Sequence, residues 1–316
     1  MGVLFGGLLL FFSAAGLYAA HQAWKYTRMI GNIFLSLVYS PPVEPSVVSR
    51  GERITILDSS QNEIAALLVG KKDSGRVVIF CHESGATKDS WEKYAAFLPD
   101  GGYAVLSVDL EKKSADGAPN ALAQWPKEAD VARLVTVIRW AKKAFRPGMG
   151  EPAGQAEIFL FGISNGADIA LAAAFRDPAV RGVVADGLFS MKEILRDYIR
   201  RWAPILVKPN LFGDNTPEWV VRLFANMGFW RCQRQSRTKF VDVEKFLRKS
   251  CVPLLMVHGE EDDYVPVGHQ RFLNRLSGKR PGAEHLVVPH AGHNQAIICG
   301  REIYEKQILG FLERVE

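Results

Sequence analysis

Cysteine is scarce in this chain, and its spacing excludes two common classes of protein. No C-x-x-C pair occurs among the four cysteines, which are Cys81, Cys232, Cys251 and Cys299. This argues against a small secreted domain held by disulfides and against a structural zinc site, and it suits a reducing compartment. Cys81 and Cys251 lie in or beside apolar runs, where we expect them to pack as small hydrophobic side chains.

Signatures of metal, nucleotide and nucleic-acid binding are also missing. His290 and His293 have no further ligands at a useful spacing, so we expect no metal. There is no P-loop, and Gly148–Gly154 does not match G-x-G-x-x-G after a strand. The net charge of +5 is modest, and no recognition motif, internal repeat or low-complexity tract is present. We therefore expect neither a cofactor nor a nucleic-acid partner.

The chain begins with 19 residues that carry no charge, from Gly2 to Ala20. As a helix this run would be roughly 28 Å long, close to the hydrocarbon thickness of a bilayer. A signal peptide is one alternative, but the run lacks a basic start and a clean cleavage site. A buried core helix is the other, but the run lacks a polar face. We expect a single-pass N-terminal membrane anchor.

Aromatic and basic residues follow the apolar run directly, and they are Trp24, Lys25, Tyr26 and Arg28. Such residues are typical of the membrane–water boundary, and cations favour its cytoplasmic side, where we place the bulk of the chain. Met29–Tyr39 is apolar but too short to span, so we expect it along the membrane surface until Pro41–Pro42. These segments make up an N-terminal region of residues 1–40.

From residue 50 onward, apolar runs typical of strands alternate with helical patterns. The strongest helical periodicity lies in Glu128–Phe145. This alternation predicts an α/β fold, with a mostly parallel central sheet and helices on both faces. The expected strands are Ile54–Asp58, Glu63–Val69, Arg76–Cys81, Tyr103–Val108, Ile158–Phe161, Val180–Val184, Val252–Val257 and His285–Val288.

The segment of about residues 190–250, between two expected strands, is longer than the connection that the alternation of strands and helices requires. We interpret it as a helical cap inserted over the carboxyl edge of the sheet. The interval 191–250 holds 13 Lys and Arg against 6 Asp and Glu, a net charge of +7, so the rest of the chain is near neutral (5 − 7 = −2). Its aromatic residues suggest an acyl or aromatic pocket, or ordinary core packing. The expected helices are Met191–Leu206, Pro217–Met227 and Val241–Lys249.

Gly162–Gly166 has the pattern G-x-S-x-G between an apolar run and a helix of small residues. This context favours a nucleophile elbow, a strand-to-helix turn that holds a serine hydroxyl out of the backbone, over an ordinary Gly-Ser turn. Two more polar groups follow expected strands, in His258–Pro266 and in Pro289–Asn294. A serine nucleophile needs a base, and the base needs a carboxylate to orient it.

With these motifs the sequence resembles the α/β-hydrolase superfamily over roughly residues 50–316, and most closely its bacterial esterase-like and prolyl-oligopeptidase-like members, without a propeller. The resemblance rests on G-I-S-N-G, H-G-E-E-D-D-Y-V-P and A-G-H-N. It implies an α/β-hydrolase fold and the chain order Ser, Asp, His. By motif match it assigns Ser164 as nucleophile, Asp262 rather than Asp263 as acid, and His293 rather than His290 as base. Asp186, after the preceding strand, is the alternative acid.

The resemblance also places an oxyanion site at the loop Phe80–Thr87. It implies that the backbone N–H groups of Ser84 and Asn165 hold the oxyanion. Glu83 departs from the glycine usual in the family, and its backbone lacks the freedom of glycine. A carboxylate aimed at the oxyanion would be repulsive, but the donor is a backbone N–H and the side chain can point away, so we expect a competent site with altered geometry. We expect His82 to be an orienting hydrogen-bonding residue, and Asp109 to cap a loop nearby.

We therefore expect a membrane-anchored serine hydrolase that cleaves carboxylic esters through an acyl-enzyme intermediate. Its substrate would be a small-molecule or lipid-like ester, and the oligomeric state stays open. A thioesterase, a lipase or a peptidase would use the same residues. A binding protein that keeps the fold and has lost the chemistry is the alternative of another class.

Overall fold

The apolar runs of the sequence form an eight-stranded sheet within the described part of the chain. The computed structural model describes residues 2–36, 50–110, 122–145, 156–206, 216–278 and 282–315. Strand ends differ from the expected ones by at most two residues. The strands are β1 (Glu52–Leu57), β2 (Glu63–Val69), β3 (Arg76–Cys81), β4 (Ala104–Val108), β5 (Glu157–Ile163), β6 (Val180–Asp186), β7 (Leu254–Gly259) and β8 (Ala283–Val288).

The sheet is mostly parallel, as predicted, with the order β1-β2-β4-β3-β5-β6-β7-β8. Only the pairs β1–β2 and β2–β4 are antiparallel among the described strands. From β4 to β8 every neighbouring pair is parallel. The carboxyl ends of β3, β5, β6, β7 and β8 therefore lie at one edge of the sheet, and the loops that follow them can meet there.

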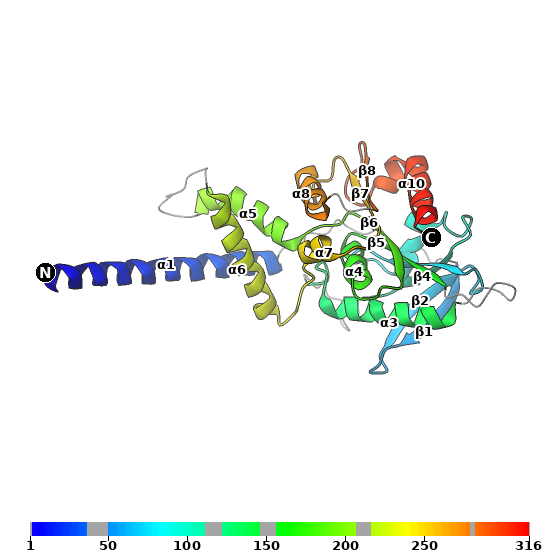
Figure 1. Ribbon diagram of the computed structural model, residues 1–316, viewed down its shortest axis with the longest axis horizontal. Coiled ribbons are helices and arrows are strands. Elements are labelled where there is room, and N and C mark those ends of the chain that lie inside the picture. Colours follow the sequence, from blue (N-terminus) through cyan, green and yellow to red (C-terminus); the bar gives the residue numbers. More distant parts are fainter. Residues whose placement is uncertain are drawn as a thin grey trace. The chain divides into compact units, whose positions relative to one another are not determined.

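Helices cover both faces of this sheet and bury its apolar side chains (Figure 1). On one face lie α3 (Glu128–Ala144), α4 (Asn165–Ala174), α7 (Val243–Lys249) and α8 (Val267–Ser277). On the other face lie α2 (Trp91–Ala95), with the short η1 (Lys88–Ser90) before it, and α9 (Ala296–Cys299) and α10 (Arg301–Arg314). Fully burying a large apolar side chain contributes about 1.5–3 kcal/mol, so this double covering is the main source of stability.

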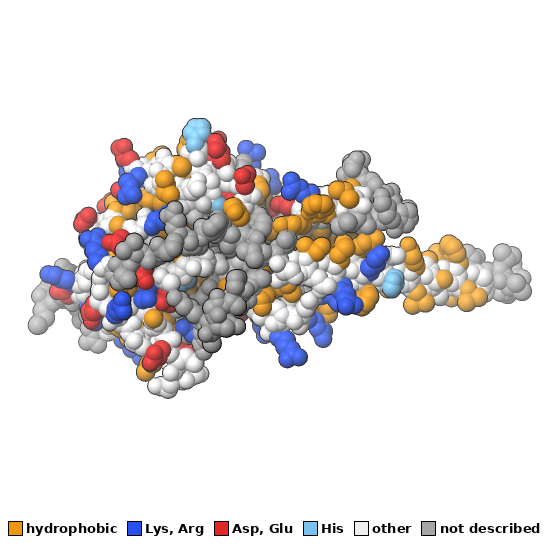
Figure 2. Space-filling model, turned by 180° about the vertical axis from the view of Figure 1, so that it is seen from behind, with side chains coloured by type: hydrophobic (Ala, Val, Ile, Leu, Met, Phe, Trp, Pro, Cys, Tyr) orange, Lys and Arg blue, Asp and Glu red, His pale blue; other side chains and the backbone are white. Residues whose placement is uncertain are grey.

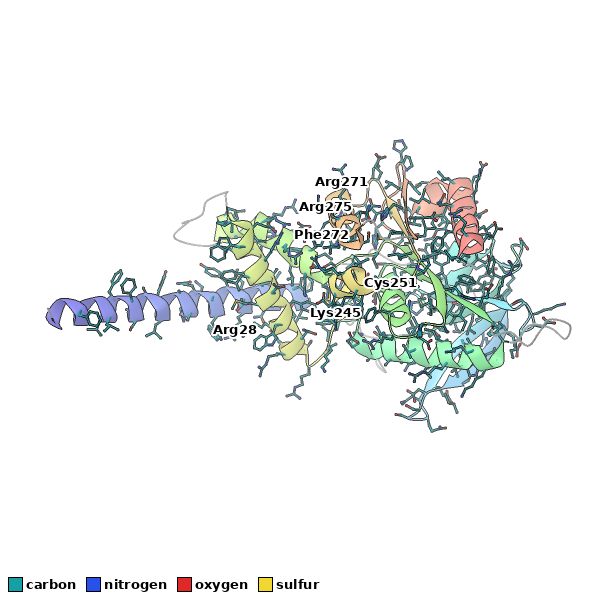
Figure 3. The ribbon with its side chains drawn as sticks, viewed as in Figure 1. Arg28, Lys245, Cys251, Arg271, Phe272 and Arg275 are labelled. Carbon is teal, nitrogen blue, oxygen red and sulfur yellow. The ribbon has the colours of Figure 1, made fainter. Side chains whose placement is uncertain are left out.

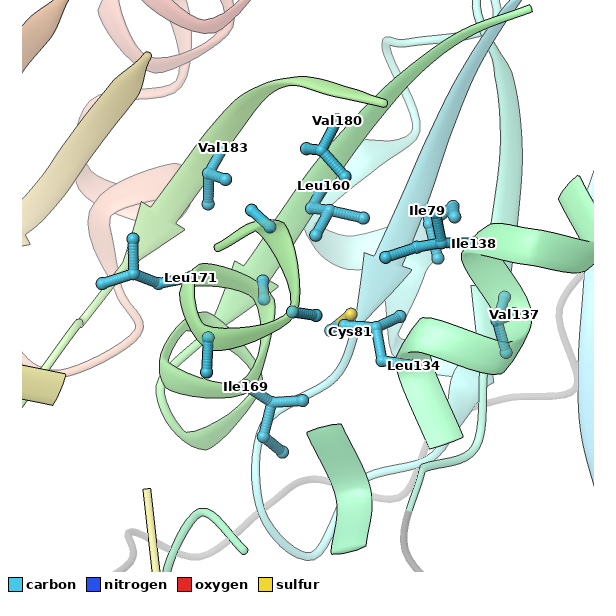
Figure 4. Close-up of a cluster of buried hydrophobic side chains, with 14 of the residues drawn as sticks. Ile79, Cys81, Leu134, Val137, Ile138, Leu160, Ile169, Leu171, Val180 and Val183 are labelled. Carbon is cyan, nitrogen blue, oxygen red and sulfur yellow. The ribbon is translucent and has the colours of Figure 1, made fainter. Parts of the chain in front are cut away.

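The helix α3 shows how the sequence pattern produces this packing. Its apolar residues Val131, Leu134, Ile138 and Ala141 recur every three to four positions and are buried. Acidic residues occupy its first turn and lysines its last turn, which suits the helix dipole. Figure 4 shows Ile138 beside Ile79 and Leu134 beside Cys81, both residues of β3, in a cluster that also includes residues of β5 and α4.

The chain divides into two compact units. The sheet unit comprises residues 38–190 and 239–316, and the helical unit comprises residues 1–37 and 191–238. The helical unit consists, in its described part, of α1 (Gly2–Ser36), α5 (Met191–Leu206) and α6 (Glu218–Ser236). That the inserted helices form a cap over the sheet stays a prediction.

Close contacts join the N-terminal helix to the insertion within the helical unit. A Cβ at Gly228 of α6 would lie 3.1 Å from Ile30 of α1 and 4.0 Å from Leu195 of α5, so the three helices approach where a side chain is absent. Gln235 donates a hydrogen bond of 2.9 Å to Asn32. The expected helix Val241–Lys249 is α7 and belongs instead to the sheet unit, because Phe246 and its neighbours are buried in the core with α4.

The structure does not support the expected membrane anchor. The helix α1 runs for 35 residues without a break at the aromatic and basic group, and so includes Lys25 and Arg28 within its length. Among the residues that the structure describes, no helix combines the length and the apolar character needed to span a bilayer. The first half of α1 exposes large apolar side chains (Figure 2), namely Phe5, Leu9, Leu10, Phe11, Phe12 and Leu17.

The stretch Met29–Tyr39, expected to lie along a membrane surface, instead continues α1 as far as Ser36. Phe34 within it is buried. Its last residues and Pro41–Pro42 lie outside the described residues, as does Gly148–Gly154. The cytoplasmic placement of the chain depended on the anchor and loses its support with it.

The four cysteines are all free thiols. Cys81 is buried in β3 as expected (Figure 4), and burial raises its pKa far above the ordinary value. Burial also raises the pKa of Cys232 to about 12. The expectation for Cys251 was wrong, because this residue precedes β7 (Figure 3) and is exposed.

Candidate active site

The turn between β5 and α4 has a backbone conformation that a non-glycine residue rarely adopts. Ser164 has φ 51° and ψ −117°. Its N–H donates to the Asp186 carbonyl at 2.7 Å, and its carbonyl accepts from the Ala167 N–H at 2.9 Å. Such strain persists only where surrounding contacts enforce it, and here it holds the serine at the carboxyl edge of the sheet.

Glycines on either side of Ser164 allow the turn to pack. A Cβ at Gly162 would lie 2.3 Å from the Gly166 carbonyl oxygen. A Cβ at Gly166 would lie 2.2 Å from the Cys81 carbonyl oxygen and 2.6 Å from that of His82. The first turn of α4 therefore lies directly against the backbone that leaves β3, at a distance that only glycine permits.

The loops after β5, β7 and β8 bring Ser164, Asp262 and His293 into one hydrogen-bonded chain. Ser164 Oγ lies 3.0 Å from His293 Nε2, and His293 Nδ1 lies 2.7 Å from Asp262 Oδ2. A carboxylate can only accept, so Nδ1 carries the proton and Nε2 is left as the acceptor of the serine hydroxyl. Three residues far apart in the sequence thus have the order and tautomer of a nucleophile, a base and an orienting acid.

Asp262 is buried and held by the backbone of its own loop. Its Oδ1 accepts from the Tyr264 N–H at 2.9 Å and from the Val265 N–H at 2.7 Å. Burial by itself would raise the pKa of Asp262, but the hydrogen bond and charge of His293 together with the Val265 N–H lower it below its ordinary value. The carboxyl group is therefore ionised at neutral pH and can stabilise a protonated imidazole.

His258 supports Asp262, and the sequence interpretation missed it. Its Nε2 donates to the Val265 carbonyl at 2.6 Å and lies 3.7 Å from Asp262 Oδ2. A Cβ at Gly259 would lie 2.3 Å from the Ala291 carbonyl oxygen, so the loops after β7 and β8 are also in direct contact. A sequence signal for it existed, because His258 is the first residue of the motif H-G-E-E-D-D-Y-V-P, which also contains Asp262.

The neighbouring candidates lie outside the chain of hydrogen bonds. His290 is exposed, with its Nδ1 3.0 Å from Glu261 Oε1, and this bond raises its pKa. Asp263 is exposed as well. Among the described residues, no group of His, Cys, Asp and Glu is arranged to hold a metal ion.

Asp186, the alternative acid, is bound to a different partner. It is fully buried at the end of β6, and its Oδ2 accepts from the Tyr304 hydroxyl at 2.8 Å. Burial raises the pKa of Asp186 to about 7, the charges of Asp262 and Glu83 add to this, and the Tyr304 bond and the His293 charge oppose it. Tyr304, which lies on α10, had no sequence signal.

The carboxylate of Glu83 is directed toward the helices behind its loop. It accepts from the Ser90 hydroxyl at 3.2 Å and from the Tyr94 hydroxyl at 3.1 Å. His82 Nδ1 donates to the Glu83 carbonyl at 2.7 Å. Asp109 accepts from the Lys88 N–H at 2.6 Å and closes this loop from the side of β4.

Comparison with known proteins places this arrangement in context. The model of the alpha/beta hydrolase family matches residues 78–298. The uncharacterised protein YqkD of Bacillus subtilis (strain 168) is 23% identical over 261 residues, which cover 80% of this chain and 76% of that protein.

Solved structures share the fold at low sequence identity. The Pyrococcus furiosus esterase Pf2001 is 18% identical, with a TM-score of 0.60 over 89% of this chain and 98% of its own. A membrane phospholipase A, described as a bacterial virulence factor, is 20% identical, with a TM-score of 0.53 over 100% of this chain and 99% of its own.

Replacement of Gly166 by alanine should destabilise the fold. The new Cβ would meet the Cys81 and His82 carbonyl oxygens, which belong to the backbone and cannot rotate away. We expect G166A to lower the free energy of unfolding by at least about 3 kcal/mol in urea denaturation, or to prevent folding. The control G268A, in α8 with nothing within 4 Å of its Cβ, should match wild type or gain up to about 1 kcal/mol. Wild-type stability of G166A would contradict the close contact.

The raised pKa of Asp186 gives the D186N variant a pH-dependent effect on stability. Between about pH 4 and pH 7 the unfolded chain releases this proton while the folded chain retains it, so the Asp186 contribution to wild-type stability falls as pH rises. The amide of D186N keeps an acceptor for Tyr304 and does not titrate. The free energy of unfolding of this variant, relative to that of wild type, should therefore rise by about 1.4 kcal/mol per pH unit across this range. Above pH 7 the difference should become constant.

Urea denaturation at pH 4.5, 6 and 8 measures this difference. The Y304F variant lacks the hydrogen bond that lowers the pKa of Asp186, so this pKa should rise further. The free energy of unfolding of Y304F should therefore continue to fall with pH above pH 7. A constant difference between D186N and wild type across this range would show that Asp186 is ionised throughout.

Proposed function

This chain belongs to the alpha/beta hydrolase family and has its fold, and we propose that it is a serine hydrolase that cleaves carboxylic esters through an acyl-enzyme intermediate. One observation carries the proposal, which is the chain of hydrogen bonds from Ser164 through His293 to Asp262. All three residues belong to the sheet unit and follow the carboxyl ends of β5, β7 and β8, which are parallel strands of one sheet.

The tautomer of His293 sets the direction of proton transfer. Its Nε2 accepts the Ser164 proton as Oγ attacks the ester carbonyl, and the carbonyl π electrons move to the oxygen. The product of this attack is a tetrahedral intermediate. Its collapse breaks the bond between the carbonyl carbon and the alcohol oxygen, and the alcohol leaves with the proton from Nε2. Water then repeats the sequence on the acyl-serine and releases the acid.

Asp262 stabilises the imidazolium that exists between these proton transfers. Its pKa stays below the ordinary value, so it remains an acceptor while His293 gains a second proton. The backbone donors at Tyr264 and Val265 hold the carboxylate in position without competing for its Oδ2.

The developing oxyanion needs hydrogen-bond donors on the side opposite to His293. Asn165 is the first residue of α4, where backbone N–H groups and the helix dipole favour negative charge. Ser84, in the loop beside it, is the proposed second donor.

An ester is the substrate class that this arrangement favours. An alcohol leaves more readily than an amine, so a triad without further groups to protonate an amine suffices. The names of similar structures, an esterase and a membrane phospholipase A, support a small-molecule or lipid-like ester.

Hydrolysis of p-nitrophenyl esters from acetate to palmitate tests this proposal and reports acyl preference. We expect S164A to lose at least about three orders of magnitude in kcat and to lose labelling by a fluorophosphonate probe, because both require the activated hydroxyl. Circular dichroism and urea denaturation check that S164A is folded. If S164A hydrolyses these esters at the wild-type rate, another group does the chemistry.

The adjacent aspartates provide a matched pair of variants. D262N should lower kcat by about 10³–10⁴-fold, because an amide at this position can donate to Nδ1 and favours the unproductive tautomer. D263N makes the same chemical change at an exposed position and should stay within about twofold of wild type. Equal effects of the two variants would refute the assignment of Asp262.

A further inference from the structure

Glu83 is a buried acidic residue that the proposed reaction leaves without a role. It is 4% exposed, in the loop that follows β3. Both of its carboxylate oxygens accept hydrogen bonds from hydroxyl groups, Oε2 from Ser90 and Oε1 from Tyr94. A buried carboxylate with both oxygens bound is costly to move, because its new site would have to supply the same donors.

The two donors are themselves fixed. Ser90 is 5% exposed and Tyr94 is 1% exposed. The ring of Tyr94 stacks on Phe80 of β3, with centroids 6.2 Å apart and planes inclined by 22°. Glu83 is thus tied to η1 and α2 and, through Tyr94, to the strand from which its own loop emerges.

The backbone carbonyl of Glu83 is held as firmly as its side chain. It accepts from His82 Nδ1 at 2.7 Å and from the Ala86 N–H at 3.2 Å. Residues 83–86 therefore form a β-turn, and Gly85 with φ 80° has the conformation that the third position of a type II turn requires.

This turn determines the direction of the Ser84 N–H. The Glu83 carbonyl and the Ser84 N–H belong to one planar trans peptide, in which they point in opposite directions. Donors that fix the carbonyl therefore fix the N–H as well. The contact of Gly166 with the Cys81 and His82 carbonyl oxygens sets the distance of this peptide from the start of α4.

We propose that Glu83 is a positioning residue, whose carboxylate, bound to Ser90 and Tyr94, and whose carbonyl, bound to His82, orient the Ser84 N–H as an oxyanion donor. This inference rests on the proposed function. Glu83 acts through the peptide that follows it, and its carboxylate touches neither Ser164 nor the substrate.

Steady-state kinetics on a p-nitrophenyl ester separates this role from a merely structural one. E83A removes both acceptors, and we expect its kcat to fall by about 10–100-fold with KM within about twofold, because an oxyanion donor acts in the transition state. E83Q should rescue kcat to within about threefold, since its amide accepts from Tyr94 and donates to the Ser90 hydroxyl. E92A truncates an exposed glutamate on the same helix as Tyr94 and should behave as wild type.

A double-variant comparison identifies the partner of Glu83. Y94F should lower kcat by itself, and E83A/Y94F should lose no more than E83A, because the bond is already absent. Additive losses would overturn the coupling. Wild-type kcat in a folded E83A, or an E83Q as impaired as E83A, would overturn the positioning role, while the S164A comparison separately decides the proposed function.

Hydrogen–deuterium exchange gives a readout that does not depend on activity. Peptides spanning residues 82–87 should exchange faster in E83A or Y94F than in wild type and E92A, and unchanged exchange would overturn the inference. If E83A does not fold, Y94F, which removes one donor and no charge, decides the question by both measurements.

Discussion

The contact between the Gly166 backbone and the carbonyl oxygens of Cys81 and His82 is the constraint on which the rest of the site depends. It joins the start of α4 to the loop after β3 at a distance that excludes any side chain. A second contact of the same kind, between Gly259 and Ala291, joins the loops after β7 and β8. Together these two contacts fix the positions of the backbone segments that carry the proposed nucleophile, acid and base and the proposed oxyanion donor. Close-packed backbone is hardly compressible, so none of these segments can move without displacing its neighbour.

Three buried carboxyl groups of this region, those of Asp262, Asp186 and Glu83, receive hydrogen bonds from different donors. Asp262 receives two backbone N–H groups and the imidazole, which outweigh the cost of burial and keep it ionised. Asp186 receives the phenol of Tyr304, but burial dominates and its pKa rises to about 7. Glu83 receives two hydroxyls that tie it to the helices behind the loop. Burial alone therefore does not decide how a carboxyl group behaves, because the groups bound to it can outweigh the cost of burial.

Much of the fold followed from the sequence, because strands and amphipathic helices depend on local patterns. The apolar runs located every strand in the described part of the chain, and their alternation with helices predicted a mostly parallel sheet. Local patterns failed where long-range packing decides. Val241–Lys249 was predicted to belong to the insertion but packs in the core, and Cys251 was predicted to be packed but is exposed before β7. The apolar N-terminus predicted a spanning helix that the described residues do not support.

The sequence by itself determined which residues could meet at the sheet edge, because parallel strands bring the segments after β3, β5, β7 and β8 together whatever else varies. Motif spacing singled out Ser164, Asp262 and His293 from their neighbours, and their catalytic roles stay predictions. Only the tertiary structure decided what surrounds them. Tyr304 comes from α10, far along the chain from Asp186, and the direction of the Glu83 carboxylate depends on hydroxyl groups of η1 and α2. Hydrogen bonds between distant segments require a precise approach of packed elements, which no local pattern of residues encodes.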